Sequence, residues 1–273
     1  MRIDNAGVGI EVADSGSGAP VVLLHGFPDS GRMWRHQVTA LSGAGFRTIV
    51  PDLRGFGSSD APEEAASYAI PFLAADVLAV LDQLGVQRAH VVGHDWGAAL
   101  AWAVASLAPD RVDHLVALSV GNPQAFTRAG MEQRERSWYM LLFQFAGIAE
   151  QWLSMDDWAN FREWCHHPDH DEVVVNLARP GRLTASLNWY RANVAPEGLV
   201  GPPLELPPVA APTMGIWSSG DRHLLEAQMA GSKDFVTGPW RYERLDGPGH
   251  WMTLEVPEEV NRLLLDFLPP SAS

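Results

Sequence analysis

The sequence predicts an α/β protein with a mostly parallel central sheet, helices on both faces of that sheet and an inserted helical cap. Short apolar runs alternate with helical patterns up to about residue 121, and the same alternation returns after residue 206. Such alternation is typical of a parallel sheet that helices cover on both sides. Residues 122–206 are instead helical in pattern and rich in aromatic side chains. We therefore expect a core of residues 1–121 and 207–273 and a cap of residues 122–206.

The predicted strands of the core are short apolar runs, the pattern of strands buried on both faces. They are PVVLL (20–24), FRTIV (46–50), AHVVG (89–93), HLVALSV (114–120) and TMGIW (213–217). The clearest helix covers residues 70–85, because its apolar positions fall on one helical face and Gly85 can end it. An amphipathic helix at residues 257–268 completes the core.

The predicted cap contains three helical segments and a proline-rich return to the core. The segments are SWYMLLFQFAGIAEQWL (137–153), DDWANFREW (156–164) and RLTASLNWYRAN (182–193), and the return is residues 196–212. An insertion of this length between two strands is typical of a cover over an active site.

The net charge and the cysteine content of the chain indicate which partners and which cellular compartment to expect. The formal net charge of -14 repels phosphate backbones and anionic lipids, so we expect no nucleic-acid partner and no membrane. The single cysteine, Cys165, fits a reducing compartment, and the N-terminal residues lack the pattern of a secretory leader. We therefore expect a cytoplasmic protein, and the sequence leaves a homodimer open.

Residues 91–100, VVGHDWGAAL, end a predicted strand in a Gly-X-Asp-X-Gly turn and begin a helix. Hydrolases often carry a nucleophilic serine in the middle of such a turn, and here the residue is Asp95. The N-terminus of the following helix favours an ionised carboxylate. Asp95 is therefore the candidate nucleophile, and the alternative is an ordinary turn with a capping aspartate.

Two further residues complete a catalytic triad in the chain order nucleophile, acid, histidine. The segment IWSSGDRHLL places Asp221 in the loop after a strand. The segment LDGPGHWM places His250 in a glycine-flanked loop near the C-terminus. A histidine in this position can act as a general base, and Asp221 can orient its ring.

The segment VVLLHGFP ends an early strand at His25–Pro28, the position at which this kind of fold supplies half of an oxyanion hole. We expect the backbone N–H groups of Phe27 and Trp96 to be the two donors. The alternative is a simple glycine–proline turn.

The motifs HGFPDS, DLRGFGSSD, GHDWG, GDRHL and GPGHW, in this order and spacing, resemble those of the soluble epoxide hydrolases of the α/β-hydrolase fold superfamily. The resemblance covers nearly the whole chain and is closest to the bacterial form, a single catalytic domain with a cap. It implies an Asp nucleophile, a His base oriented by a second Asp, and two cap tyrosines that hold the epoxide oxygen. Tyr139 and Tyr190 lie in contexts similar to that tyrosine pair.

A carboxylate nucleophile also restricts the substrate by its chemistry. Attack on a carbonyl carbon would give a mixed anhydride, whereas attack on a saturated carbon with a leaving group gives an alkyl ester of Asp95. Water deprotonated by His250 can then hydrolyse that ester. The substrate is therefore expected to be an epoxide or an alkyl halide, and the product of an epoxide is a vicinal diol.

Two tyrosines in the cap favour the epoxide, because the alkoxide formed on ring opening needs a proton and a phenol is protonated at neutral pH. The alternative is a haloalkane or fluoroacetate-type dehalogenase with the same triad. Phe27 stands where haloalkane dehalogenases often carry Asn, and Trp96 stands where fluoroacetate dehalogenases usually carry Arg. A binding protein that uses the pocket without turnover is a second class, which diol formation would exclude.

The aromatic and aliphatic content of the cap predicts an apolar or aryl-bearing epoxide. We expect the residues that contact it to be His25, Pro28, Trp96, Trp138 and Trp189. No cofactor is expected, since RGFGSS is too short for a dinucleotide-binding loop. The histidine-rich segment 164–172 is interpreted as a solvated cap loop and not as a metal site.

Overall fold

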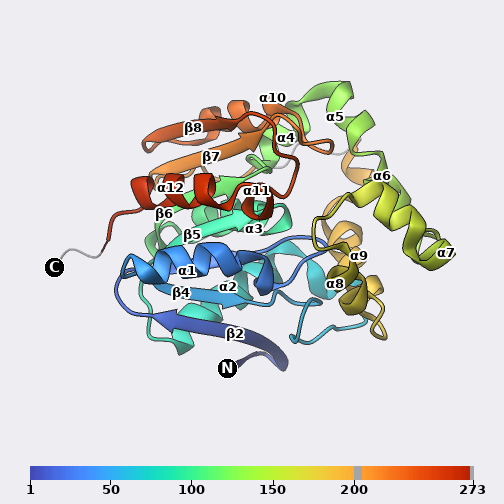
Figure 1. Cartoon of the computed structure of the whole chain (residues 1–273), viewed down its shortest axis with the longest axis horizontal. Helices are drawn as coiled ribbons and strands as arrows, with labels where there is room; N and C mark the ends of the chain where they lie inside the picture. The colour runs from blue at the N-terminus through green and yellow to red at the C-terminus, as the bar shows by residue number, and fades with distance from the viewer. Residues whose placement is uncertain (200–204, 271–273) are drawn as a thin grey trace.

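The computed structural model describes residues 1–199 and 205–270 and contains one continuous, mostly parallel sheet (Figure 1). Its strand order is β1-β2-β4-β3-β5-β6-β7-β8. The first two pairs, β1 with β2 and β2 with β4, are antiparallel, and every other pair is parallel. The strands are β1 (Arg2–Asn5), β2 (Val8–Gly16), β3 (Pro20–Leu24), β4 (Arg47–Pro51), β5 (Ala89–His94), β6 (Val112–Leu118), β7 (Thr213–Ser218) and β8 (Trp240–Leu245).

Helices cover both faces of this sheet and form the cap. Those of the core are α1 (Arg35–Gly43), α2 (Ile70–Gln83), α3 (Trp96–Leu107), α10 (Glu226–Ala230), α11 (Met252–Glu255) and α12 (Pro257–Phe267). Those of the cap are α4 (Pro123–Arg128), α5 (Gly130–Arg136), α6 (Trp138–Leu142), α7 (Ile148–Cys165), α8 (His170–Leu177) and α9 (Arg182–Asn193). Short 3-10 turns occur at Gly31–Trp34, Ala65–Tyr68, Pro109–Arg111, Pro196–Leu199 and Gly231–Phe235.

The central strands have apolar residues on both faces because each face meets a different set of helices. In β3, Val21 and Leu23 belong to the cluster that includes side chains of α1 and α12. Val22 and Leu24 belong to the cluster that includes side chains of α2 and α3 and continues into the cap. Since successive side chains of a strand point to opposite faces, an uninterrupted apolar run suits this two-sided burial.

The predicted fold class is confirmed, and most predicted elements agree with the structure to within two residues. The predicted helix at residues 70–85 is α2, and Gly85 follows it with φ 68°. Tyr242 lies in β8 and donates a hydrogen bond of 2.8 Å to Glu226. Strands β1 and β2 were not predicted, because their polar and glycine-rich segments lack a long apolar run.

The cap differs more from its prediction. The single helical segment expected at residues 137–153 is broken between α6 and α7. The break coincides with Gly147, which has φ 79° and whose backbone N–H donates a hydrogen bond of 2.7 Å to Oε2 of Glu150. Within α7 the backbone leaves helical geometry from Met155 to Trp158. The expected return at residues 196–212 is described only in part, since residues 200–204 lie outside the described residues.

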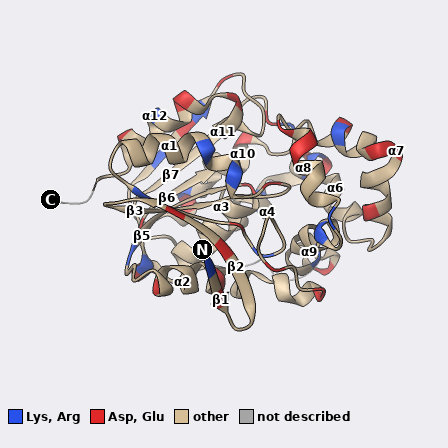
Figure 2. Cartoon of the chain, turned by 60° about the horizontal axis from the view of Figure 1, so that its bottom comes forward, with Lys and Arg blue, Asp and Glu red and all other residues tan. Residues whose placement is uncertain are grey.

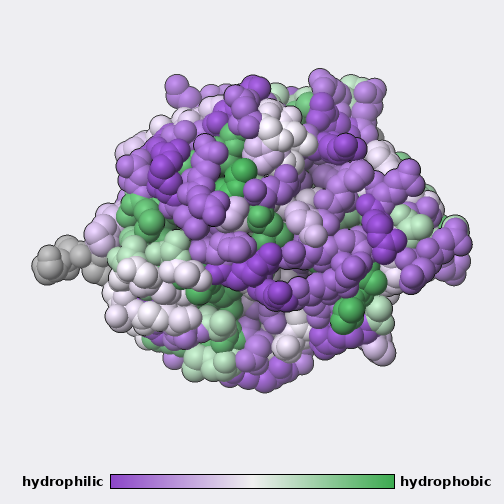
Figure 3. All heavy atoms as spheres, in the orientation of Figure 1, coloured by the Kyte–Doolittle hydropathy of each residue, from purple (hydrophilic) through white to green (hydrophobic). Residues whose placement is uncertain are grey.

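The face of the molecule that Figure 3 shows is largely hydrophilic, with separate apolar patches, and Figure 2 shows acidic residues on the helices α7 and α8 of the cap. Within residues 1–199 and 205–270, no helix combines the length and the apolar character needed to cross a bilayer.

Candidate active site

Asp95 occupies a tight turn between the end of β5 and the start of α3, with φ 54° and ψ -123°. Glycines make this turn sterically feasible. A Cβ atom on Gly93 would collide with the carbonyl of Gly97, and one on Gly97 would collide with the carbonyl of Leu24. The close packing of the turn therefore holds Asp95 in an unusual backbone conformation, with its side chain beyond the carboxyl end of β5.

The Asp95 carboxylate lies between a backbone donor and an imidazole. Its Oδ1 accepts a hydrogen bond of 2.8 Å from the Phe27 N–H, and its Oδ2 lies 3.6 Å from Nε2 of His250. The loop that carries Phe27 is held by the buried ring of His25, whose Nε2 accepts a hydrogen bond of 2.9 Å from the Leu53 N–H. One of the two expected oxyanion donors therefore already points at the carboxylate.

His250 is held from its other side by Asp221, which follows β7. Nδ1 of His250 lies 2.8 Å from Oδ2 of Asp221, and Oδ1 of Asp221 accepts hydrogen bonds from the N–H groups of His223 and Leu224. Burial alone would raise the pKa of Asp221, but the neighbouring His250 and these hydrogen bonds leave it below its ordinary value. Asp221 therefore stays ionised and fixes the proton of His250 on Nδ1.

The environment of His250 contains two opposing influences. Burial lowers the pKa of its imidazole, whereas the charges of Asp221 and Asp95 and their hydrogen bonds raise it. The second influence is the larger, and the pKa of His250 is raised to about 10. The balance therefore favours an imidazolium as long as both carboxylates are charged.

The backbone carbonyl of His250 is also anchored. It accepts hydrogen bonds of 2.8 Å from Nε2 of His94 and 3.2 Å from Oγ of Ser119. Burial, followed by the neighbouring His250, lowers the pKa of His94 to about 4, so His94 is a neutral donor. His94, which precedes the candidate nucleophile in the chain, therefore positions the loop of the candidate base.

Tyr139 from α6 and Tyr190 from α9 come together above this arrangement. Both are buried, and their ring centroids are 6.1 Å apart. The ring of Tyr190 meets Trp96 edge-on at 5.1 Å and Phe27 at 5.7 Å. Burial, and then the charge of Asp95, raises the pKa of each tyrosine well above its ordinary value. Both phenols are therefore protonated, as proton donors to an alkoxide must be.

The residues expected to contact substrate divide into three groups. Trp96 and Trp189 pack together at 5.8 Å beside Tyr190, so they belong to the aromatic wall of the site. His25 and Pro28 are buried in the loop that carries Phe27. Trp138 is 47% exposed, and its ring packs edge-on against Trp152, away from this cluster. The structure therefore does not support the expected contact of Trp138 with substrate, because the helical face that carries it points outward.

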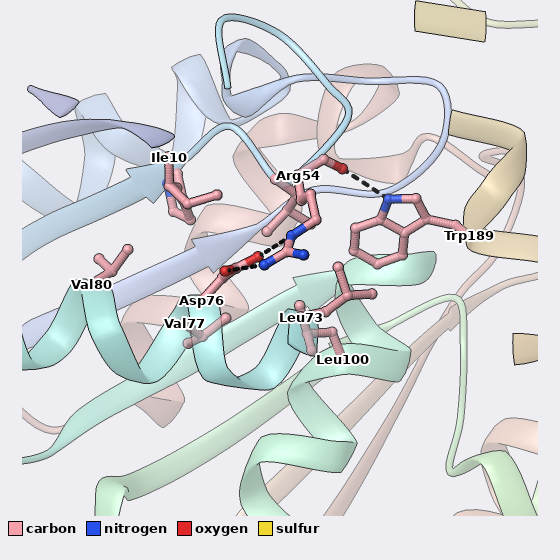
Figure 4. A pocket seen from close by; sticks show the side chains of 10 residues that line it. Ile10, Arg54, Leu73, Asp76, Val77, Val80, Leu100 and Trp189 are labelled. Carbon is pink, nitrogen blue, oxygen red and sulfur yellow. Dashed lines mark hydrogen bonds and ion pairs between the residues drawn. The ribbon is translucent and has the colours of Figure 1, made fainter. Parts of the chain in front are cut away.

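Trp189 is anchored to the core by its indole N–H, which donates a hydrogen bond of 2.9 Å to the Arg54 carbonyl (Figure 4). The Arg54 guanidinium forms a bidentate ion pair with Asp76, with distances of 2.8 and 2.7 Å, and both side chains are buried. The small cavity in Figure 4 is lined by these residues and apolar side chains, and none of the predicted catalytic residues lines it. It is a packing feature behind the site.

The prediction that residues 164–172 form a solvated loop is wrong, because the two ends of the segment belong to α7 and α8 and Cys165, His167 and His170 are buried. His167 lies between the cap and the core. Nε2 of His167 lies 3.0 Å from Oδ1 of Asp29, and Nδ1 accepts a hydrogen bond from the Asp169 N–H. Asp29 also accepts a hydrogen bond of 3.0 Å from the indole of Trp251, the residue after His250. No local pattern marks a contact between residues 138 positions apart, which is why sequence reasoning missed it.

Comparisons with known proteins identify the family to which the chain is similar. The alpha/beta hydrolase fold family matches residues 19–257. The chain is 33% identical to epoxide hydrolase A of Mycobacterium tuberculosis, over 97% of this chain and 96% of that protein. It is 31% identical to an epoxide hydrolase of Caballeronia sordidicola, with 96% and 91% covered.

Solved structures give the same result. The crystal structure of epoxide hydrolase A from Mycobacterium thermoresistibile is similar with a TM-score of 0.84 at 31% identity, over 100% of this chain and 99% of that one. The Bacillus megaterium epoxide hydrolase in complex with an inhibitor is similar with a TM-score of 0.88 at 28% identity, over 98% and 99%.

Proposed function

This chain belongs to the alpha/beta hydrolase fold family and to the epoxide hydrolases within it, and we propose that it hydrolyses an epoxide to a vicinal diol through a covalent ester on Asp95. The observation that carries the proposal is the position of the Asp95 carboxylate. It lies between the Phe27 N–H and the His250–Asp221 pair, and two protonated cap tyrosines share its surroundings.

In the first step, an oxygen of Asp95 attacks one carbon of the epoxide ring. The carbon–oxygen bond of the ring breaks, and its electron pair moves to the ring oxygen. Tyr139 and Tyr190 bind this oxygen, and one of them transfers its proton to the developing alkoxide. Because both phenols are buried near the Asp95 charge, their protons are retained until that charge is used to form the ester.

In the second step, His250 removes a proton from water, and the water oxygen attacks the carbonyl carbon of the Asp95 ester. The negative charge develops on the ester oxygen that faces the Phe27 N–H, a donor already 2.8 Å from Oδ1. Collapse of this intermediate breaks the bond between the carbonyl carbon and the alkyl oxygen of the ester. That oxygen takes the proton from His250 and becomes the second hydroxyl of the diol. The remaining water proton passes from the Asp95 carboxyl group to the tyrosinate, so the enzyme is restored.

Ester formation also prepares His250 for the second step. The Asp95 charge helps to raise the pKa of His250 to about 10 in the free enzyme, and the ester carries no such charge. The pKa of His250 therefore falls when Asp95 is alkylated, and the imidazolium releases its proton to solvent, so that the neutral base forms at the stage that requires it. His250 takes up a proton again from solvent when the charge of Asp95 is restored.

The walls of the site favour an apolar or aryl-bearing substrate. Phe27 meets the rings of Phe143, Trp164 and Tyr190 at centroid distances of 5.9, 6.2 and 5.7 Å. Aromatic walls of this kind contribute binding energy by excluding water from an apolar ligand. Styrene oxide is therefore a suitable first substrate.

The test is a parallel assay with styrene oxide and 1-bromobutane, scoring diol and free bromide. We expect diol from styrene oxide and no bromide, and Asp95→Asn as the matched control should give neither product. Bromide release without any diol would assign the same triad to dehalogenation and contradict the proposal.

A further inference from the structure

His223 is a buried imidazole at the site to which the proposed mechanism gives no role. It lies in the loop after β7, two residues beyond Asp221, and is 9% exposed. Its ring meets Tyr139 at 5.5 Å and Trp164 at 5.4 Å on the cap side. On the core side it meets His250 at 5.5 Å. The side chain is therefore part of the wall that surrounds the reacting groups.

The backbone of His223 is fixed from both sides. Its N–H donates a hydrogen bond of 2.8 Å to Oδ1 of Asp221, and its carbonyl accepts one of 2.8 Å from Nε2 of Gln133 in α5. Gln133 is itself buried and also accepts a hydrogen bond from the Leu225 N–H. These contacts from the core and the cap define where the imidazole lies.

The two ring nitrogens of His223, in contrast, take part in no hydrogen bond among the residues that the structure describes. The ring is perpendicular to that of His250, at an angle of 86°, and both nitrogens of His250 already face carboxylates. Proton exchange between the two histidines therefore has no direct path. The polar atoms of His223 are free for a group that enters the site.

A neutral imidazole offers one donor and one acceptor. Burial, and then the neighbouring His250, lowers the pKa of His223 to about 4, so the ring is uncharged at neutral pH. Beside the phenol of Tyr139 and the indole of Trp164 it adds a further polar group to the wall, and a hydroxyl group could pair with it as donor, acceptor or both.

Resting on the proposed function, we infer that His223 hydrogen-bonds a hydroxyl substituent beside the epoxide ring, so that the preferred substrates are aryl epoxides with a neighbouring hydroxyl group. The aromatic wall takes the aryl group, and His223 takes the polar one. A site with a buried polar group discriminates against an analogue that lacks the matching hydroxyl.

The test uses two substrates that differ by one hydroxyl group, 3-phenylglycidol and trans-1-phenylpropylene oxide. The readout is the ratio of their kcat/KM values. We expect the unmodified protein to prefer 3-phenylglycidol, and His223→Phe to reduce that preference by about 2- to 12-fold, the value of one net hydrogen bond. His223→Asn, which keeps a polar group, should retain part of the preference.

His36→Phe, at an exposed position of α1, is the matched control and should leave the ratio unchanged. His223→Leu provides a second apolar variant should the Phe variant fail to fold. If both epoxides are hydrolysed, to a triol and a diol respectively, and the apolar variants keep the original ratio or slow both substrates equally, the role of His223 is overturned while the proposed function stands. If the unmodified protein hydrolyses neither epoxide, both are contradicted.

Discussion

The core side and the cap side of the site are held by different interactions. On the core side, Asp95, Asp221 and His250 sit just beyond strand ends and are fixed by hydrogen bonds, many of them to backbone groups. On the cap side, Tyr139 and Tyr190 are held mainly by packing of aromatic rings. The core side thus has a geometry set by the sheet, whereas the cap side depends on how the cap docks.

Several hydrogen bonds join the cap to the core. The indole N–H of Trp189 donates a hydrogen bond to the Arg54 carbonyl, and the ring of His167 is hydrogen-bonded to Asp29. Asp29 also accepts a hydrogen bond from the indole of Trp251, the residue after His250. The two sides also serve different steps in the proposed mechanism, because the phenols act in ester formation and His250 acts in ester hydrolysis. Substitutions on each side should therefore fail at different points.

The largest expected effect is on the core side. His250→Gln removes the base of the second step and should lower turnover by about 10²- to 10⁴-fold, while alkylation of Asp95 proceeds. Intact-protein mass spectrometry after exposure to styrene oxide should show one adduct, and peptide mapping should place it on Asp95. A protein that remains unmodified would contradict the ester, and Asp95→Asn provides the control without a nucleophile.

The cap side should fail earlier in the reaction. Tyr139→Phe combined with Tyr190→Phe removes both donors to the alkoxide and should slow epoxide opening by about 100-fold or more. Combined further with His250→Gln, the same change should prevent the adduct from accumulating. Unchanged diol formation would show that the tyrosines take no part in the mechanism, and the two sides would then not serve different steps. Tyr242→Phe, in β8, is the matched control.

A titration sharpens the account of the core side. His250 is mostly charged below its raised pKa of about 10 and neutral above it, and Asp95 contributes to that rise. Asp95→Asn, which mimics the uncharged ester, should lower the pKa of His250, so that the neutral form appears at lower pH. NMR of the imidazole nitrogens can follow this change, with Asp110→Asn as a surface control. An unchanged pKa would mean that ester formation does not prepare the base.

The smallest effect on turnover is expected from the docking contacts. His167→Phe removes a partner of the buried Asp29 and should lower the free energy of unfolding by about 1–3 kcal/mol. Turnover by the folded variant should change by less than about threefold, since His167 touches no proposed reacting group. Chemical denaturation and steady-state assays give the two values. A large loss of turnover at unchanged stability would show that docking and chemistry are more tightly coupled.

The same contrast explains what the sequence could predict. The nucleophile, acid and base follow strands, so their motifs are local and chain order alone brings them to one sheet edge. The cap residues depend on helix rotation and docking, which no short motif records. Hence Trp138 was expected at the site but faces outward, and His167 was expected in solvent but lies buried.

Residues near a motif can also be missed when their partners are distant. His223 is two positions from Asp221, but only the fold shows that its ring lies between Tyr139 and His250. The antiparallel strands β1 and β2 were missed for a different reason. Their pairing depends on β4 and on backbone hydrogen bonds, and their own residues are too polar to form an apolar run.

In the proposed mechanism, the oxygen added to the product comes from a carboxylate and not directly from water. A single turnover in H₂¹⁸O with enzyme in excess distinguishes these two routes. The label should enter the side chain of Asp95, and the first diol formed should carry none. Label found in that first diol, with none in the protein, would show direct attack by water and contradict the ester.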